Sequence, residues 1–168
     1  PLGQASASRV VAKIQTEGYA LIATHPGGTV TRAAEIGGLA LTRVSALDLQ
    51  EPLADRLVAE MGVSGELNVV KVALPYNGMW AVDFTRVGVD KGAAARALAS
   101  MLGIEPGQMA AVGDSYNDLP MLRAAGLAIA MADAPEELKA VADHVCPSVD
   151  KDGLAIAIDE IVLPAIER

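Results

Sequence analysis

Aromatic residues are scarce in this chain of 168 residues: they make up 3% of it, whereas hydrophobic residues as a whole make up 52%. An interior with few large rings must be filled by Ala, Val, Leu and Ile, which are the residues that helices and a parallel sheet bury against each other. The scarcity therefore favours an α/β protein over a β-sandwich or a barrel. The length predicts one hydrophobic core with at most a small appendage.

Positive charge and cysteine are also in short supply. The chain has 13 Lys and Arg against 21 Asp and Glu, which gives a formal net charge of −8 and an isoelectric point near 4.7. Without a basic cluster, such a chain is not expected to bind nucleic acid or a membrane surface. The single cysteine, Cys146, cannot form an internal disulfide, and neither a signal peptide nor a long apolar run is evident. We expect a cytoplasmic protein.

Hydrophobic periodicity predicts helices that alternate with buried strands at both ends of the chain. Gly18 and Gly103 each follow a helical pattern at the position of a left-handed C-cap. The predicted helices are 6–17, 29–36, 91–102, about 117–125, one that starts near Asp133, and a last one from about 153. The predicted buried strands are 19–23, 109–112, 127–131 and 144–146.

The stretch 39–87 interrupts this alternation. It contains a predicted helix over 51–61 and two strands, 67–74 and 79–85, separated by the dipeptide Asn77-Gly78, which is a strong hairpin-turn signal. A hairpin inside an α/β chain is typical of an inserted lid. We therefore predict three segments: core residues 1–38, a reduced cap insertion over 39–87, and core residues 88–168.

Two carboxylates follow the predicted strand 109–112. Asp114 comes directly after Gly113, which we expect to let the backbone turn sharply at the sheet edge where open α/β sheets bind ligands. Asp118 lies four residues on and would repel Asp114 unless a cation intervened, and Mg²⁺ prefers a few carboxylates together with water and phosphate. The alternative is a plain strand-to-helix turn in which Asp118 only favours the helix dipole.

Lys91 and Thr24 are the other candidate site residues. Lys91 opens a predicted helix, where a cation opposes the helix dipole, so a phosphate-binding role explains it better than stability does. Thr24 follows the strand 19–23, where its hydroxyl could donate to a phosphoryl oxygen. Each has a simpler alternative, a solvated lysine and a threonine that ends a strand. No Gly-x-Gly-x-x-Gly follows any strand, which argues against a dinucleotide-binding domain.

Taken together, these residues resemble the haloacid dehalogenase-like (HAD) superfamily, specifically its Cof-like branch of sugar-phosphate phosphatases. Gly-Val-Asp-Lys-Gly at 88–92 is similar to the third motif of that family. Gly-Asp-Ser-Tyr-Asn-Asp-Leu-Pro-Met-Leu at 113–122 is similar to the fourth, and Asp-His-Val-Cys at 143–146 and Asp-Gly-Leu at 152–154 are similar to the downstream pattern. Ala-Thr at 23–24 corresponds in position to the second motif, but the family's following Gly-Arg is here His-Pro.

The resemblance implies a Rossmann-like core, with a parallel sheet and helices on both faces, and a small α+β cap that contains the β-hairpin. It implies a Mg²⁺-dependent phosphatase that acts on phosphate monoesters of small metabolites, sugar phosphates first, through an aspartyl-phosphate. In this scheme Asp114 ligates the metal and Asp118 supports it, Lys91 and Asn117 steady the substrate phosphate, and Thr24 donates to a phosphoryl oxygen. The protein would be a monomer or a homodimer.

The first motif of the family, an Asp-x-Asp that supplies the nucleophile and the general acid, has no match, since no Asp precedes Asp48. Three explanations stay open: a piece of an active phosphatase, a remnant that binds phosphate esters without turnover, or a second chain that donates the missing strand. We favour the first, because a sheet without a central strand exposes unpaired backbone. Trp80 and Tyr76 either pack the hairpin or contact the leaving group of a substrate or a neighbouring subunit.

Overall fold

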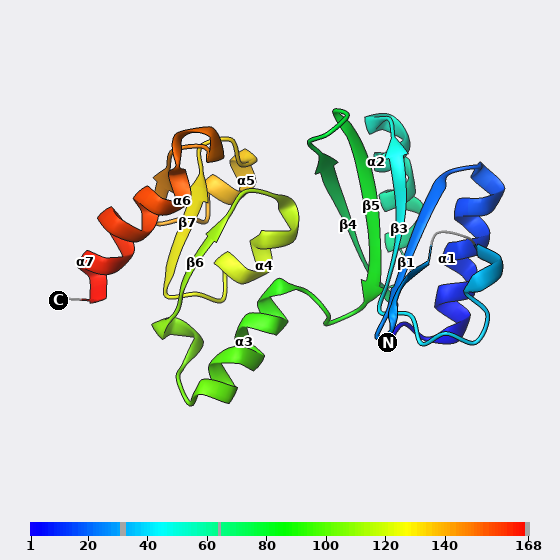
Figure 1. Cartoon of the computed structure of the whole chain (residues 1–168), viewed down its shortest axis with the longest axis horizontal. Coiled ribbons are helices and arrows are strands. Elements are labelled where there is room, and N and C mark those ends of the chain that lie inside the picture. Colours follow the sequence, from blue (N-terminus) through cyan, green and yellow to red (C-terminus); the bar gives the residue numbers. More distant parts are fainter. Residues whose placement is uncertain (31–32, 64, 167–168) are drawn as a thin grey trace. The chain divides into compact units, whose positions relative to one another are not determined.

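The computed structural model describes residues 1–30, 33–63 and 65–166 and divides into two compact units, Pro1–Val89 and Asp90–Arg168 (Figure 1). Each unit has its own sheet, with five strands in the first and three in the second. Within the described ranges, no helix combines the length and the apolar character that a membrane span requires. We describe the two units one at a time.

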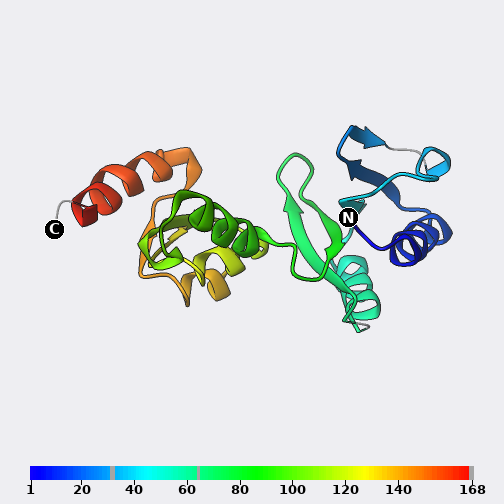
Figure 2. The same cartoon turned by 90° about the horizontal axis from the view of Figure 1, so that it is seen from below.

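The first unit is an antiparallel sheet with two helices on one of its faces (Figures 1 and 2). Its strands run in the order β2-β1-β3-β5-β4, so that the β4–β5 hairpin forms one edge. The elements are α1 (Gln4–Glu17), β1 (Ala20–His25), β2 (Gly28–Val30), the 3₁₀ turn η1 (Ala33–Glu35), β3 (Arg43–Leu49), α2 (Glu51–Gly62), β4 (Leu67–Leu74) and β5 (Met79–Arg86).

The core of this unit lies between the helices and the three central strands. Cross-strand pairing places Ala23 beside Val44 and Val44 beside Phe84, and all three side chains are fully buried. Helix α1 adds Val10 and Ile14, which lie one turn apart and so face the same side. The strands are thus held by rows of apolar cross-strand neighbours, which the apolar faces of α1 and α2 cover.

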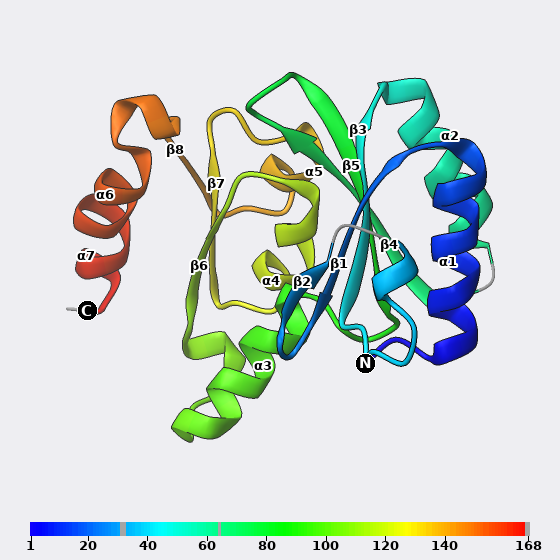
Figure 3. The same cartoon turned by 45° about the vertical axis from the view of Figure 1, so that its right-hand side comes forward.

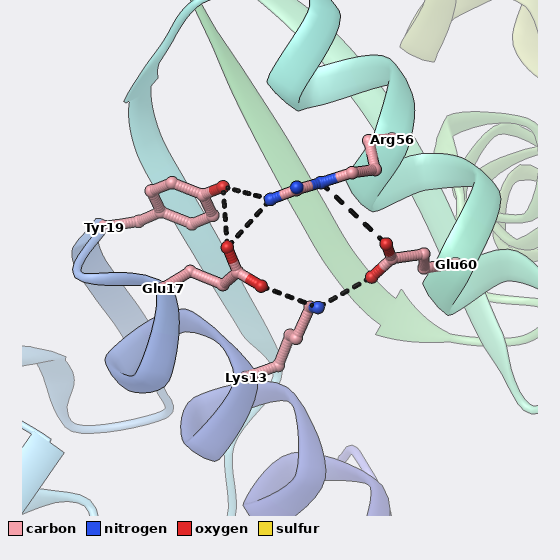
Figure 4. A network of polar contacts seen from close by, with 5 residues as sticks. All are labelled: Lys13, Glu17, Tyr19, Arg56 and Glu60. Carbon is pink, nitrogen blue, oxygen red and sulfur yellow. Dashed lines mark hydrogen bonds and ion pairs between the residues drawn. The ribbon is translucent and has the colours of Figure 1, made fainter.

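A network of charged side chains joins the two helices at the surface (Figure 4). The ammonium group of Lys13 lies 2.9 Å from Glu17 and 2.6 Å from Glu60, and the guanidinium group of Arg56 donates to Glu17 at 2.8 Å and to the Tyr19 hydroxyl at 3.1 Å. The hydrogen bond from Lys13 is the main reason that the pKa of Glu17 lies below its ordinary value. Solvent screens these charges, so the network adds modestly to the apolar packing beneath it.

The second unit is a three-stranded parallel sheet in the order β6-β7-β8. Local signals that were visible in the sequence begin and end several of its elements. Helix α3 (Lys91–Leu102) starts after Asp90, whose carboxylate accepts from the Ala93 amide at 2.7 Å, and ends at Gly103 in the left-handed conformation. The other elements are η2 (Pro106–Gln108), β6 (Ala110–Gly113), η3 (Tyr116–Asp118), α4 (Leu119–Leu122), β7 (Leu127–Met131), α5 (Glu136–Lys139), β8 (His144–Cys146), η4 (Val149–Lys151), α6 (Gly153–Ala157), the π-helical η5 (Ile158–Val162) and α7 (Leu163–Ile166).

Helices cover both faces of this small sheet (Figure 3). Ala128 and Ala130 of β7 pack in one apolar cluster with Leu122 of α4, and Ile129 and Met131 pack in a second cluster on the other face, with Cys146 and the α6–η5 segment. Both faces of β7 are buried, which explains its uninterrupted apolar sequence. A parallel sheet with helices on both faces is therefore confirmed for the second unit, and Cys146 is a buried free thiol.

The structure corrects the fold prediction for the N-terminal half. Strand β1 is not part of a parallel core sheet, because it pairs antiparallel with β3 on one side and with β2 on the other. Residue 38 lies inside the first unit, and the division into core and cap segments stays a prediction. Instead of the helix predicted over 29–36, the chain forms the end of β2 and the short turn η1; residues 31 and 32 of that prediction lie outside the described ranges. Strand β3 was not predicted, because Ser45 and Asp48 interrupt its apolar pattern.

The predicted hairpin is confirmed, and its aromatic residues differ in environment. The turn places Gly78 at a φ of 68°, and the side chain of Asn77 accepts from the Met79 amide at 3.0 Å. Trp80 packs against the core of the first unit, with the Lys71 ammonium 4.3 Å from its ring centroid. Tyr76 is largely exposed, and its hydroxyl lies 3.3 Å from Asp48. Trp80 therefore has the packing role that was one of its predicted alternatives.

Candidate phosphate and metal site at the end of strand β6

The candidate site begins where β6 ends, at the carboxyl edge of the parallel sheet. Gly113 is the last residue of the strand, and its backbone does not have the positive φ that favours glycine, so the sharp turn that we expected there is not the reason for it. The reason is space. A Cβ on Gly113 would lie 2.6 Å from the Cβ of Asp118 and 2.8 Å from a methyl group of Leu122. Only glycine lets the Asp118 side chain pack against the strand end.

Asp118 is the buried centre of the site, with 3% of its surface exposed. One of its oxygens, Oδ2, accepts from the backbone amides of Asp114 and Ser115, each at 3.1 Å, and the other, Oδ1, pairs with the ammonium group of Lys91. Three donors therefore satisfy a carboxylate that would otherwise be costly to bury. The side chain fixes the loop after β6 and ties it to the start of α3.

Lys91 reaches this carboxylate from the first residue of α3. The Asp90 side chain caps the helix, so the orientation of its first turn is set locally. About half of the Lys91 side chain is exposed although its ammonium group is paired. An ammonium group has three donor hydrogens, and the pair with Asp118 leaves donors of Lys91 for a second anion.

Asp114 stands in a different environment from Asp118 and is exposed. Desolvation of its carboxylate, followed by the hydrogen bond and the charge of the neighbouring Asp118, raises the pKa of Asp114, and the positive charge of Lys91 opposes this shift. Burial alone would also raise the pKa of Asp118, but the Lys91 ammonium and the two backbone amides outweigh it, so the pKa of Asp118 lies below its ordinary value. Among the described residues, Asp118 has an ion pair with Lys91 and none is found for Asp114.

Asn117 lies in the turn η3, between the two carboxylates in sequence, and Ser115 holds it. The Ser115 hydroxyl donates to the amide oxygen of Asn117 at 2.6 Å. Both side chains are half-buried. The sequence prediction named Asn117 but did not single out Ser115, because a serine in a turn carries no signal that distinguishes a hydrogen bond to a site residue from an ordinary turn bond.

Thr24 is the one predicted site residue that lies in the first unit. It lies in β1 of the first unit, between Thr29 of β2 and Arg43 of β3, whereas Lys91, Asp114, Asn117 and Asp118 all belong to the second unit. The carboxyl edge of a parallel sheet, where we expected Thr24, is absent at this position because the strand is antiparallel. Its hydroxyl oxygen is buried and has no hydrogen-bond partner among the described residues.

A cation of the magnesium type fits what these residues offer. Among the described residues, no three His, Cys, Asp or Glu side chains group closely enough to hold a metal by themselves. Mg²⁺ commonly takes one or two carboxylates and completes its shell with water and substrate phosphate. The open oxygens of Asp114 meet that requirement. The oxygens of Asp118 already accept three hydrogen bonds, which makes it a support for the site more than a direct ligand.

Comparison with known proteins relates this geometry to a family. The family model described as haloacid dehalogenase-like hydrolase matches residues 63–158, which is more than half of the chain. A phosphoglycolate phosphatase of Methanopyrus kandleri is 33% identical over 132 residues, covering 78% of this chain and 54% of that protein. The 5-amino-6-(5-phospho-D-ribitylamino)uracil phosphatase of Bacillus subtilis is 38% identical over 92 residues, covering 55% of this chain and 32% of that protein. The chain thus spans about half the length of the first relative and a third of the second.

A solved structure gives the same answer for the fold. A haloacid dehalogenase-like hydrolase from Bacillus subtilis superimposes with a TM-score of 0.82 at 19% identity, and the match covers 92% of this chain and 70% of that one. The five-stranded antiparallel sheet and the three-stranded parallel sheet are consistent with a cap and part of a core. The resemblance that we noted in the third and fourth motifs is confirmed: the chain belongs to the haloacid dehalogenase-like hydrolase family, in its Cof-like branch.

Proposed function

We propose that this chain carries the metal-binding and phosphate-binding part of a Mg²⁺-dependent phosphatase that hydrolyses phosphate monoesters of small metabolites. The observation that carries the proposal is the buried Asp118, which pairs with the Lys91 ammonium on one side and holds the Asp114 loop on the other. A positive group and an open carboxylate are thereby fixed at one strand end. This combination suits a phosphate that arrives together with a divalent cation.

Each residue has a role in this proposal. Asp114 is the ligand for Mg²⁺, the metal that this family typically uses, and Asp118 supports the metal's waters and positions Lys91. Lys91 binds a phosphoryl oxygen, and Asn117 donates to another. The bound metal supplies positive charge to the transferring phosphoryl group, which is where most catalysis of phosphoryl transfer lies. The role of Thr24, which lies in the first unit, stays a prediction.

The chemical step requires a nucleophile that these residues do not supply. In the proposed reaction, an aspartate oxygen attacks phosphorus, the bond to the ester oxygen breaks, and the alcohol leaves with a proton from a second acid. Water then hydrolyses the aspartyl-phosphate. No Asp-x-Asp precedes α1, because the first aspartate of the chain is Asp48. We place that motif in the part of the relatives that this chain does not span.

The substrate class follows from the relatives. Their names identify phosphoglycolate and a ribityl phosphate as substrates of those proteins. We propose a small phosphorylated metabolite of the same kind for the protein to which this chain belongs, with phosphoglycolate and phosphorylated sugar derivatives to be tried first. The antiparallel sheet of the first unit is proposed to act as the cap.

Binding to the chain itself is the first test. Backbone amide spectra of the ¹⁵N-labelled chain are recorded while Mg²⁺ and then inorganic phosphate are added. We expect the amides of Asp114 and Ser115 to shift with Mg²⁺, and Asp114→Asn to abolish that shift. The matched control is Asp150→Asn, which removes an equal charge from an exposed position in the same unit. Equal responses of the two variants would show that Mg²⁺ binds elsewhere or not at all.

Turnover is tested separately, in the full-length protein that contains this chain. We expect hydrolysis of p-nitrophenyl phosphate that depends on Mg²⁺ and is lost in Asp114→Asn but not in Asp150→Asn. Phosphate binding without any turnover of that substrate, of phosphoglycolate or of sugar phosphates would favour the alternative, a protein that binds phosphate esters without hydrolysing them.

A further inference from the structure

The turn η3 contains one contact that the proposed function does not use. The Ser115 hydroxyl lies 2.6 Å from the amide oxygen of Asn117, and both side chains are half-buried. A primary amide has two chemically different ends, an acceptor oxygen and a donor NH₂ group, and a rotation of half a turn exchanges them. Which end faces the bound phosphate therefore depends on what holds the other end.

We propose that Ser115 is a positioning residue that fixes the orientation of the Asn117 amide, so that its NH₂ group and not its oxygen faces the phosphate. This inference rests on the proposed function. With the oxygen held by Ser115, the NH₂ group has no acceptor among the described residues and is free to donate. The opposite orientation would direct the amide oxygen at an anion, with a repulsion in place of a hydrogen bond.

Two backbone hydrogen bonds hold Ser115 in place beside Asn117. The Ser115 amide donates to Asp118 Oδ2 at 3.1 Å, and the Asp118 amide donates to the Ser115 carbonyl at 2.9 Å. The Ser115 side chain also accepts from the Asp118 amide in a capping box, so its oxygen is held by the turn while its hydrogen is left to donate. The same hydroxyl therefore caps the turn and holds the amide oxygen of Asn117.

The test has two readouts on the ¹⁵N-labelled chain, for Ser115→Ala and for the conservative variant Ser115→Thr. The first is the order parameter of the Asn117 side-chain NH₂ group, assigned through its loss in Asn117→Ala. The second is the affinity for inorganic phosphate in the presence of Mg²⁺. We expect Ser115→Ala to lower the order parameter and to weaken phosphate binding roughly 2-fold to 10-fold, the size of one hydrogen bond. Ser115→Thr keeps the hydroxyl and should restore both.

A double-mutant cycle separates positioning from a general effect on the fold. If Ser115 acts through Asn117, then Ser115→Ala has no further effect on phosphate affinity in the Asn117→Ala background. An equal loss in both backgrounds overturns the proposal, because Ser115 would then act on the ligand or on the loop directly. An unchanged order parameter in Ser115→Ala overturns it whatever phosphate does.

The proposed function and the role of Ser115 fail in different ways. If the wild-type chain binds no phosphate at any Mg²⁺ concentration, the proposed function is wrong, and the positioning role falls with it, although the order parameter of Asn117 would still respond to Ser115→Ala. If wild type binds phosphate and Asn117→Ala binds it equally well, the site is correct and only the Asn117 and Ser115 roles are wrong.

Discussion

Gly113→Ala is the substitution that most directly tests how the site is built. The new Cβ would lie 2.6 Å from the Cβ of Asp118, whereas ordinary contacts begin at 3.4 Å, so the two groups must separate by about 0.8 Å (3.4 − 2.6). Asp118 cannot yield freely, since its oxygens are held by Lys91 and by two backbone amides. The strand end and the turn must therefore move apart.

The expected cost follows from this clash. Overpacking in a well-packed region typically costs about 1–3 kcal/mol. Removal of a glycine from a strand returns about 0.5–1 kcal/mol through the unfolded chain. We expect the second unit to lose about 1–2 kcal/mol of its free energy of unfolding. The Asp114 loop should also bind Mg²⁺ more weakly, because its backbone amides are held by the Asp118 carboxylate.

Urea unfolding followed by NMR measures this loss in the correct unit. The sole tryptophan, Trp80, lies in the first unit, so its fluorescence does not report on the site. The amide signals of β7 report on the second unit, because that strand is buried between the two helical layers. The matched control is Gly107→Ala, whose Cβ meets no atom within 4 Å. If Gly113→Ala and Gly107→Ala unfold at the same urea concentration, the packing explanation of Gly113 is refuted.

Three further predictions concern single side chains. Asp118→Asn should destabilise the second unit by about 2–3 kcal/mol, since a buried acceptor of three hydrogen bonds loses its charge; Asp150→Asn, measured by the same β7 amide signals, should change it by less than about 0.5 kcal/mol. Trp80→Ala should lower the free energy of unfolding of the first unit by about 2–3 kcal/mol, below the range for a fully buried tryptophan, as measured by circular dichroism. An unchanged unfolding midpoint would favour the alternative that Trp80 contacts the substrate. Glu17→Gln should destabilise the first unit at neutral pH. The folded-state pKa of Glu17 is depressed, so this difference from wild type should vanish as the pH falls below the ordinary glutamate pKa of 4.5 and then through the folded-state pKa. A difference in the unfolding midpoint, measured by Trp80 fluorescence, that persists in acid would contradict the ion pairs of Figure 4.

The sequence by itself determined the elements whose signals are local. Helix α3 spans 91–102 and ends before Gly103, as the sequence predicted, because a cap acts within one turn. Strand β7 appears where its continuous apolar run stands, and the β4–β5 hairpin turns at Asn77-Gly78. The family was recognisable for a related reason: the fourth motif keeps its chemistry-bearing residues within six consecutive positions, so no long-range contact is needed to identify it.

Only the tertiary structure decided what depends on partners distant in the chain. An apolar strand such as β1 looks the same whether its neighbours run parallel or antiparallel, and its antiparallel pairing with β3 shows that Thr24 does not end a strand of a parallel sheet. Likewise, the pairing of Asp118 with Lys91 joins residues 27 positions apart. That contact, with the burial around it, gives the two neighbouring carboxylates different environments: Asp118 is held by three donors, and Asp114 stays open to a cation.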